Sequence, residues 1–264
     1  MIGRLMRGMV VMLGLAAASE GALAASAGSG VPGGVERLVW AYGGAIARIE
    51  GGDLVWHDAT RMPIDDGRGM KSFEAWLAAP DLKDMFRQSY PAGAPAVAPP
   101  REFDPGRARN TALFDKLYGD CVTGGVAAHL VDVVWLPKKY GKSLRFNGRH
   151  GAAERLAAVS QRLDALPSHF DDFLLPPAGT YHCRPIAGTN RISAHGYGIA
   201  IDLAVKRSHY WRWAGGVSGP YRNEIPDEIV AAFEAEGFIW GGRWSHFDTM
   251  HFEYRPELIG PTGR

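Results

Sequence analysis

Cysteine is scarce in this chain of 264 residues, which contains only Cys121 and Cys183. So few thiols exclude a zinc or iron–sulfur module built from several cysteines. An excess of charge of one sign is also lacking, since 29 basic residues face 28 acidic ones. This near neutrality argues against a general nucleic-acid binder. Nine histidines are present, and together with carboxylates they can form a small metal or acid–base site.

The chain also lacks an apolar run long enough to span a bilayer, which takes about 20 residues. Its start shows a different pattern: Arg4 and Arg7 precede a short apolar run over residues 8–18, and the small residues Ala22 and Ala24 follow. A positive start, a short apolar run and a small-x-small motif are typical of a cleaved signal peptide. We therefore expect cleavage after Ala24 and a secreted or periplasmic protein without a stable membrane anchor.

Export bears on whether the two cysteines form a disulfide. In an oxidising compartment a pair of cysteines more often forms a disulfide than stays free. We expect a bridge between Cys121 and Cys183, with two buried, unbridged side chains as the alternative. Metal binding by the Cys183 thiolate ranks below both, because an exposed thiol oxidises easily outside the cytoplasm.

The hydrophobic pattern predicts both helices and strands, and hence an α+β protein. Helices are expected at 35–49, 73–79, 82–87, 107–118 and 153–166, with paired strands at 130–136 and 143–147. Ser72 and Asp104 are expected to cap the second and the fourth of these helices.

Residues 89–106 are rich in Pro, Gly and Ala and are expected to form a linker. About 65 residues before this linker are few for an independent core. We therefore divide the chain into a signal peptide (1–24), a mainly helical N-terminal extension with its linker (25–106) and one catalytic domain (107–264).

Two short segments concentrate the chemistry. In the first, His195 is followed by a strand-like alternation that places Ala200 and Asp202 on one face. Asp202 lies among core aliphatic residues, where a charged group needs a partner or a metal.

The second segment ends in another alternation, in which His251 and Glu253 share a face. With His195 and Asp202, His251 completes a set of two histidines and one aspartate. Three ligands with an open fourth position are typical of catalytic zinc. Asp248 stands three residues before His251 and is a candidate general base. Glu253 is either an alternative base or, as we favour, a group that supports a ligand from behind.

The motifs Ser-x-His-x-x-x-x-Ala-x-Asp, over residues 193–202, and Asp-x-x-His, over residues 248–251, together resemble the VanX/VanY-type zinc peptidases. This family includes D-alanyl-D-alanine dipeptidases and carboxypeptidases and phage L-alanyl-D-glutamate endopeptidases, and it shares a fold with the hedgehog signalling domain. The strong resemblance covers residues 180–256. It implies a small antiparallel sheet with flanking helices.

The same resemblance implies roles for individual residues. His195, Asp202 and His251 would bind one Zn²⁺ ion, and Asp248 would be the general base. Arg184 is the best match for the substrate-binding arginine of the family, with Arg191 as a rival, and Ser193 matches a serine near the substrate.

Three classes of function follow. The leading hypothesis is an exported zinc peptidase that cleaves peptidoglycan peptides, as a D-alanyl-D-alanine carboxypeptidase or an L-alanyl-D-glutamate-type endopeptidase. The second is a non-catalytic zinc-binding module of hedgehog-like fold that binds a wall component or a protein. The third is a zinc hydrolase with a substrate outside the cell wall. Asp248 and Arg184 favour catalysis over binding alone.

Overall fold

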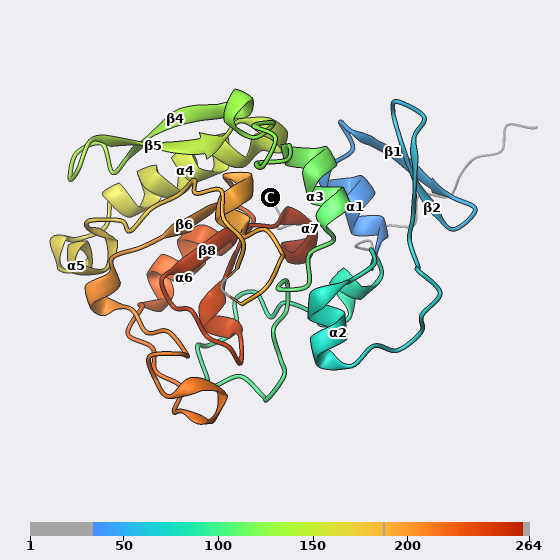
Figure 1. Ribbon diagram of the computed structural model, residues 1–264. Coiled ribbons are helices and arrows are strands. Elements are labelled where there is room, and N and C mark those ends of the chain that lie inside the picture. Colours follow the sequence, from blue (N-terminus) through green and yellow to red (C-terminus); the bar gives the residue numbers. More distant parts are fainter. Residues whose placement is uncertain (1–33, 187, 261–264) are drawn as a thin grey trace, which may run out of the picture. The chain divides into compact units, whose positions relative to one another are not determined.

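The computed structural model describes residues 34–186 and 188–260, which form a mixed α+β fold with small antiparallel sheets (Figure 1). This confirms the predicted fold class. The predicted signal peptide and its cleavage site lie outside the described residues. Within the described ranges, no helix combines the length and apolarity needed to cross a membrane.

The N-terminal part of the described chain contains strands as well as short helices, rather than being mainly helical. Its elements are α1 (Glu36–Ala41), β1 (Ile46–Glu50), β2 (Asp53–Trp56), β3 (Arg61–Pro63) and α2 (Phe73–Ala78). The helix predicted over residues 35–49 is wrong in its second half. Gly43 and Gly44 follow the end of α1, and the apolar residues beyond them pair with β2 as an antiparallel strand. The helix at residue 73 is confirmed, and Ser72 Oγ accepts the predicted capping hydrogen bond.

The remaining elements are α3 (Thr111–Tyr118), β4 (Leu130–Trp135), β5 (Lys142–Asn147), α4 (Ala152–Asp164), α5 (Asp171–Leu174), β6 (Ala200–Asp202), α6 (Asp227–Glu234), β7 (Phe238–Trp240), β8 (His251–Tyr254) and α7 (Pro256–Ile259). The predicted pairing of β4 with β5 is confirmed and is antiparallel.

The helix expected from residue 107 begins later than predicted. Asn110 Oδ1 accepts a hydrogen bond from the Leu113 amide at 3.0 Å and so caps α3. Asp104, the predicted cap, instead pairs with Arg107 and His246. Residues 107–109 therefore precede α3 without helical geometry, and they lie beside the pocket described below.

The sheet β6–β8–β7 separates the predicted site from the core. In β8, Phe252 packs against Phe233 of α6 with ring centroids 3.9 Å apart and also stacks on Trp240. Since side chains alternate along a strand, His251 and Glu253 lie on the opposite face, as predicted. The apolar face of β8 therefore fixes the orientation of its polar face.

One hydrophobic core joins the N-terminal elements to the rest of the described chain. Polar contacts reinforce this packing: the hydroxyl of Tyr42 donates to Glu257 at 2.7 Å, and that of Tyr90 donates to Glu234 at 2.7 Å. The extension thus packs on the part of the chain that carries the predicted site. The boundary drawn at residue 106 stays a prediction.

The two cysteines form the predicted disulfide, with a Cα–Cα distance of 5.6 Å. Cys121 lies just beyond α3, and Cys183 immediately precedes Arg184. The bridge thereby ties the predicted substrate-binding segment to a core helix.

Candidate metal centre and active site

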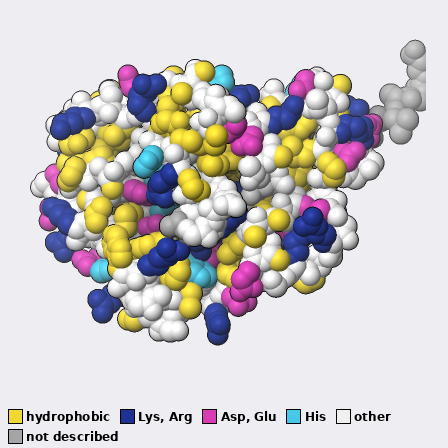
Figure 2. Space-filling model, in the orientation of Figure 1, with side chains coloured by type: hydrophobic (Ala, Val, Ile, Leu, Met, Phe, Trp, Pro, Cys, Tyr) yellow, Lys and Arg dark blue, Asp and Glu magenta, His cyan; other side chains and the backbone are white. Residues whose placement is uncertain are grey.

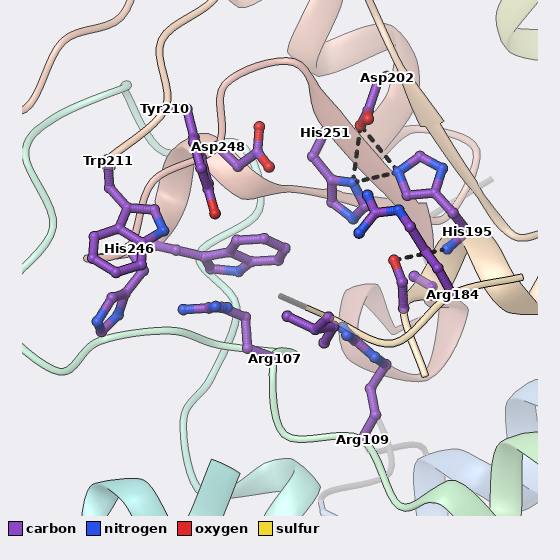
Figure 3. Close-up of a pocket in the computed structure, with 14 residues that line it drawn as sticks. Arg107, Arg109, Arg184, His195, Asp202, Tyr210, Trp211, His246, Asp248 and His251 are labelled. Atoms are coloured by element: carbon purple, nitrogen blue, oxygen red, sulfur yellow. Dashed lines mark hydrogen bonds and ion pairs between the residues drawn. The ribbon is translucent and has the colours of Figure 1, made fainter. Parts of the chain in front are cut away.

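A pocket beside the sheet contains most of the predicted site residues (Figure 3). It is lined by Arg107, Arg109, Arg184, Ile186, Ser193, Ala194, His195, Asp202, Tyr210, Trp211, Trp244, His246, Asp248 and His251. In the same orientation as Figure 1, basic, acidic and histidine side chains gather over the region of β6 and β8 (Figure 2). The pocket is therefore strongly polar, although its walls include three tryptophan and tyrosine rings.

The structure brings His195, Asp202 and His251 together in one cluster. His195 Nε2 lies 3.2 Å from His251 Nδ1, and Asp202 Oδ1 lies 3.1 Å from each of these nitrogens. Asp202 and His251 are direct cross-strand partners in β6 and β8. His195 comes from the 3₁₀ turn before β6, which ends at Gly198 with a φ of 67°. A left-handed residue at this point favours glycine.

The outer contacts of the two imidazoles show which nitrogens carry protons. His195 Nδ1 lies 2.6 Å from the carbonyl oxygen of Thr180, and His251 Nε2 lies 3.1 Å from Glu253 Oε2. Because both partners only accept, these two nitrogens donate. When each ring is neutral, the other two nitrogens therefore direct lone pairs toward Asp202 Oδ1.

This donor set fits a metal ion. Three acceptor atoms that face one another at 3.1–3.2 Å repel unless a cation or a proton lies between them. In a tetrahedral zinc site with ligand distances of about 2.0 Å, ligand atoms lie about 3.3 Å apart. Two imidazoles and a carboxylate, each imidazole held by a hydrogen bond on its far nitrogen, are typical of such sites.

The electrostatics of the cluster also favour a cation. Burial alone would raise the pKa of Asp202, but His195 and His251 hold it well below its usual range. Burial lowers the pKa of His251, whereas Asp202 and Glu253 outweigh burial and raise it to about 10. Both shifts express the attraction of two carboxylates for positive charge at this position.

Glu253 supports His251 from a fully buried position. Its carboxylate also pairs with Arg109 at 3.1 Å and with Arg255 at 2.9 Å. Burial would raise the pKa of Glu253, but Arg109, His251 and Arg255 lower it well below its usual range. Glu253 is thus occupied by three partners, which agrees with a supporting role and leaves its assignment a proposal.

Asp248 lies between Tyr210 and His251 at the edge of the cluster (Figure 3). Its Oδ1 is buried without a hydrogen-bond partner among the described residues. Burial, and next the nearby Asp202, raise the pKa of Asp248 to about 6. A buried carboxylate with a pKa near neutrality and an unused oxygen has the properties of a general base.

The predicted substrate-binding residues lie in different places. Arg184 lines the pocket and directs its guanidinium toward His251 (Figure 3). Ser193 also lines the pocket, but its Oγ accepts a hydrogen bond from the His195 amide and caps the 3₁₀ turn. Arg191 stands outside the lining, and its Nη1 donates to the carbonyl of Arg107 at 3.1 Å. Between the two rival arginines, the geometry favours Arg184.

Further residues complete the pocket. Arg107 and Arg109 come from the extended segment before α3, and Tyr210 comes from the loop after β6 and pairs through its backbone with Asp248. His246 lines the pocket as well and pairs with Asp104 at 2.6 Å. The assignment of residues 107–109 to a helix hid these two arginines from the sequence interpretation.

A cleft that combines a His–Asp–His cluster with a half-buried carboxylate, one oxygen of which is buried and unpartnered, is typical of metal-dependent hydrolases. Residues 187–254 match a peptidase family described as D-alanyl-D-alanine carboxypeptidase. The matched segment contains His195, Asp202, Asp248 and His251. The resemblance to VanX/VanY-type peptidases is thus confirmed, and at this level the chain carries a carboxypeptidase-like peptidase segment.

Proposed function

We propose that this protein is an exported zinc-dependent peptidase that hydrolyses peptidoglycan stem peptides, as a D-alanyl-D-alanine carboxypeptidase or an L-alanyl-D-glutamate-type endopeptidase. The observation that carries the proposal is the convergence of three metal-ligand atoms beside the unpartnered Oδ1 of Asp248. The family match supports the substrate class. The disulfide supports export, because such bridges persist in oxidising compartments.

Each residue has a distinct role in the proposed mechanism. His195, Asp202 and His251 would hold the zinc ion, which would supply Lewis-acid chemistry. Asp248 accepts a proton from the attacking water and delivers it to the leaving amine. Arg184 donates to the oxyanion or to the terminal carboxylate of the substrate. Glu253 holds the ring of His251 in the ligating orientation.

The direct test is incubation of the protein with purified wall peptides, with and without a chelator. Release of D-alanine that stops on chelation supports the carboxypeptidase, and internal fragments support the endopeptidase. Asp248→Ala is expected to keep zinc and lose turnover, whereas the double variant His195→Ala, Asp202→Ala is expected to lose zinc. Normal hydrolysis by Asp248→Ala would exclude Asp248 as the base.

A second candidate is a non-catalytic zinc-binding module for a wall component or a protein. The buried pocket position of Asp248 disfavours it, because a binding module gains nothing from a carboxylate that lacks a partner. Zinc-loaded protein that binds wall peptides but leaves them intact would support this second candidate.

A further inference from the structure

Two arginines enter the pocket from the side away from the metal-binding cluster. Arg107 and Arg109 come from the segment before α3 at the lower side of Figure 3. The Arg109 side chain points upward and the Arg107 guanidinium extends toward His246, whereas His195, Asp202 and His251 occupy the upper right. This segment lies outside the region of family resemblance, residues 187–254. The two guanidinium groups are therefore a feature of this chain that the proposed mechanism does not use.

The guanidinium of Arg107 is held in place while most of its donors remain available. Its Nη1 donates to Asp104 Oδ2 at 2.6 Å, and the group lies over the Trp244 ring at 5.5 Å from the centroid. An arginine has five N–H donors in a planar fork. Across the described ranges, the side chain of Arg107 makes no further hydrogen bond, so its other donors are free to bind a ligand.

Arg109 has an unused donor in a more buried position. The residue is 8% exposed, and its Nη1 is occupied by Glu253. Its Nε is buried and has no partner in the part of the chain that the structure describes. A buried donor without a partner is costly, so an acceptor bound beside Arg109 would stabilise this side of the pocket.

Three guanidinium groups on this side of the pocket, those of Arg107, Arg109 and Arg191, face two paired carboxylates, Asp104 and Glu253, which leaves an excess of positive charge. The carboxylates that line the pocket, Asp202 and Asp248, lie at the metal side. The two arginines also affect Arg191. Burial, and then the positive charges of Arg109 and Arg107, lower the pKa of the Arg191 guanidinium to about 10. An anionic group brought to this side would relieve the repulsion among the three guanidinium groups.

We propose that Arg107 and Arg109 form a second carboxylate-binding subsite, which makes the enzyme selective for acidic peptides with a carboxylate besides the group that Arg184 contacts. This inference rests on the proposed peptidase function. In a stem peptide the second carboxylate has two sources: the α-carboxylate of a γ-linked D-glutamate, and the extra carboxylate of a diamino diacid in the third position. A planar guanidinium fork matches a carboxylate bidentately, which explains the use of arginine here.

Two pairs of pentapeptides distinguish these sources. One pair differs only in whether the glutamate α-carboxyl is free or amidated, and the other has a diamino diacid or lysine in the third position. For the zinc-loaded protein we expect kcat/KM to be about tenfold or more higher for the carboxylate form of at least one pair. In Arg107→Gln this ratio should fall close to one, and in Arg107→Lys it should be intermediate.

Arg212→Gln is the matched control, because Arg212 also lies over a tryptophan of this region, Trp211, but is exposed and outside the pocket lining. Its selectivity ratio should equal that of the unaltered protein. Equal kcat/KM within both pairs, or a ratio that survives Arg107→Gln, would overturn the subsite while leaving the peptidase function intact.

A binding measurement separates the subsite from the proposed function. The dissociation constants of the same peptides are measured from tryptophan fluorescence on zinc-loaded Asp248→Asn, with and without Arg107→Gln. If the unaltered protein hydrolyses none of the peptides, the peptidase proposal fails. Preference for the carboxylate form that disappears with Arg107→Gln then still supports the subsite, and equal dissociation constants overturn it.

Discussion

Asp248 is costly to the fold for the same reason that it suits catalysis. Its carboxylate is buried with an unpartnered oxygen, and burial followed by Asp202 raises its pKa to about 6. A carboxyl group whose pKa is higher in the folded than in the unfolded state favours folding only when it is protonated. Above pH 6 the ionised group therefore destabilises the metal-free protein, and a bound cation offsets this cost.

We predict that Asp248→Asn stabilises the metal-free protein. At pH 8 the free energy of unfolding should rise by up to about 3 kcal/mol. This is the free-energy equivalent of raising the pKa of Asp248 from 3.8 to about 6 on folding. Near pH 4 the gain should be small, because the folded protein is then protonated at this position. Urea unfolding at both pH values measures the difference, and a gain of the same size at pH 4 would contradict the assigned cause.

Glu253 allows a test of how its hydrogen bond with His251 supports zinc binding by that histidine. We predict that Glu253→Gln lowers zinc affinity about 10- to 100-fold, because the amide polarises His251 less than a carboxylate does. Competition with a chelator measures this affinity. The matched control is Glu257→Gln, which removes another buried charge paired with Arg255 but does not touch His251. Both variants should lose stability, and only Glu253→Gln should lose zinc affinity.

At the scale of elements, the sequence predicted those parts of the site that depend on local alternation. The face shared by His251 and Glu253 follows from strand periodicity alone, and the structure has it. The apolar residues after Gly44 fit a helical period equally well, and only pairing with β2 makes them a strand. Arg107 and Arg109 could not be found in this way, because an extended segment held by distant partners has no periodic signal.

The disulfide acts at the scale of elements as well, since it joins the segment beyond α3 to the one that carries Arg184. We predict that the double variant Cys121→Ser, Cys183→Ser loses about 4 kcal/mol of stability, from a closed loop with a sequence separation of 62 residues. Its KM for peptide should rise more than its kcat falls, because Arg184 loses its anchor while the metal ligands keep theirs. Denaturant unfolding and steady-state kinetics measure the two effects, and an unchanged KM would show that Arg184 is positioned without the bridge.

At the scale of the whole described chain, the N-terminal extension supplies parts that the metal-binding segment lacks. Asp104 fixes both His246 and Arg107 at the pocket, and the hydroxyl of Tyr90 accepts a hydrogen bond from the Trp240 amide at 2.9 Å. These contacts are buried and polar, so their loss leaves unsatisfied groups in the core. These contacts hold the extension against the rest of the described chain, and the division at residue 106 stays a prediction.

We predict that residues 107–264 alone do not form the native fold, whereas a chain cut between the exposed residues Val97 and Ala98 does. The cut chain keeps the hydrogen bonds of Tyr42 and Tyr90 to the rest of the protein. The shortened chain leaves Glu257 and Glu234 without these hydroxyl partners. Near-ultraviolet circular dichroism and cooperative unfolding distinguish the two outcomes. Gel filtration of the cut protein should show both fragments in one peak. A shortened chain that unfolds cooperatively and binds zinc would mean that the metal site is self-sufficient, and that the extension only holds Arg107 and His246 in place through Asp104.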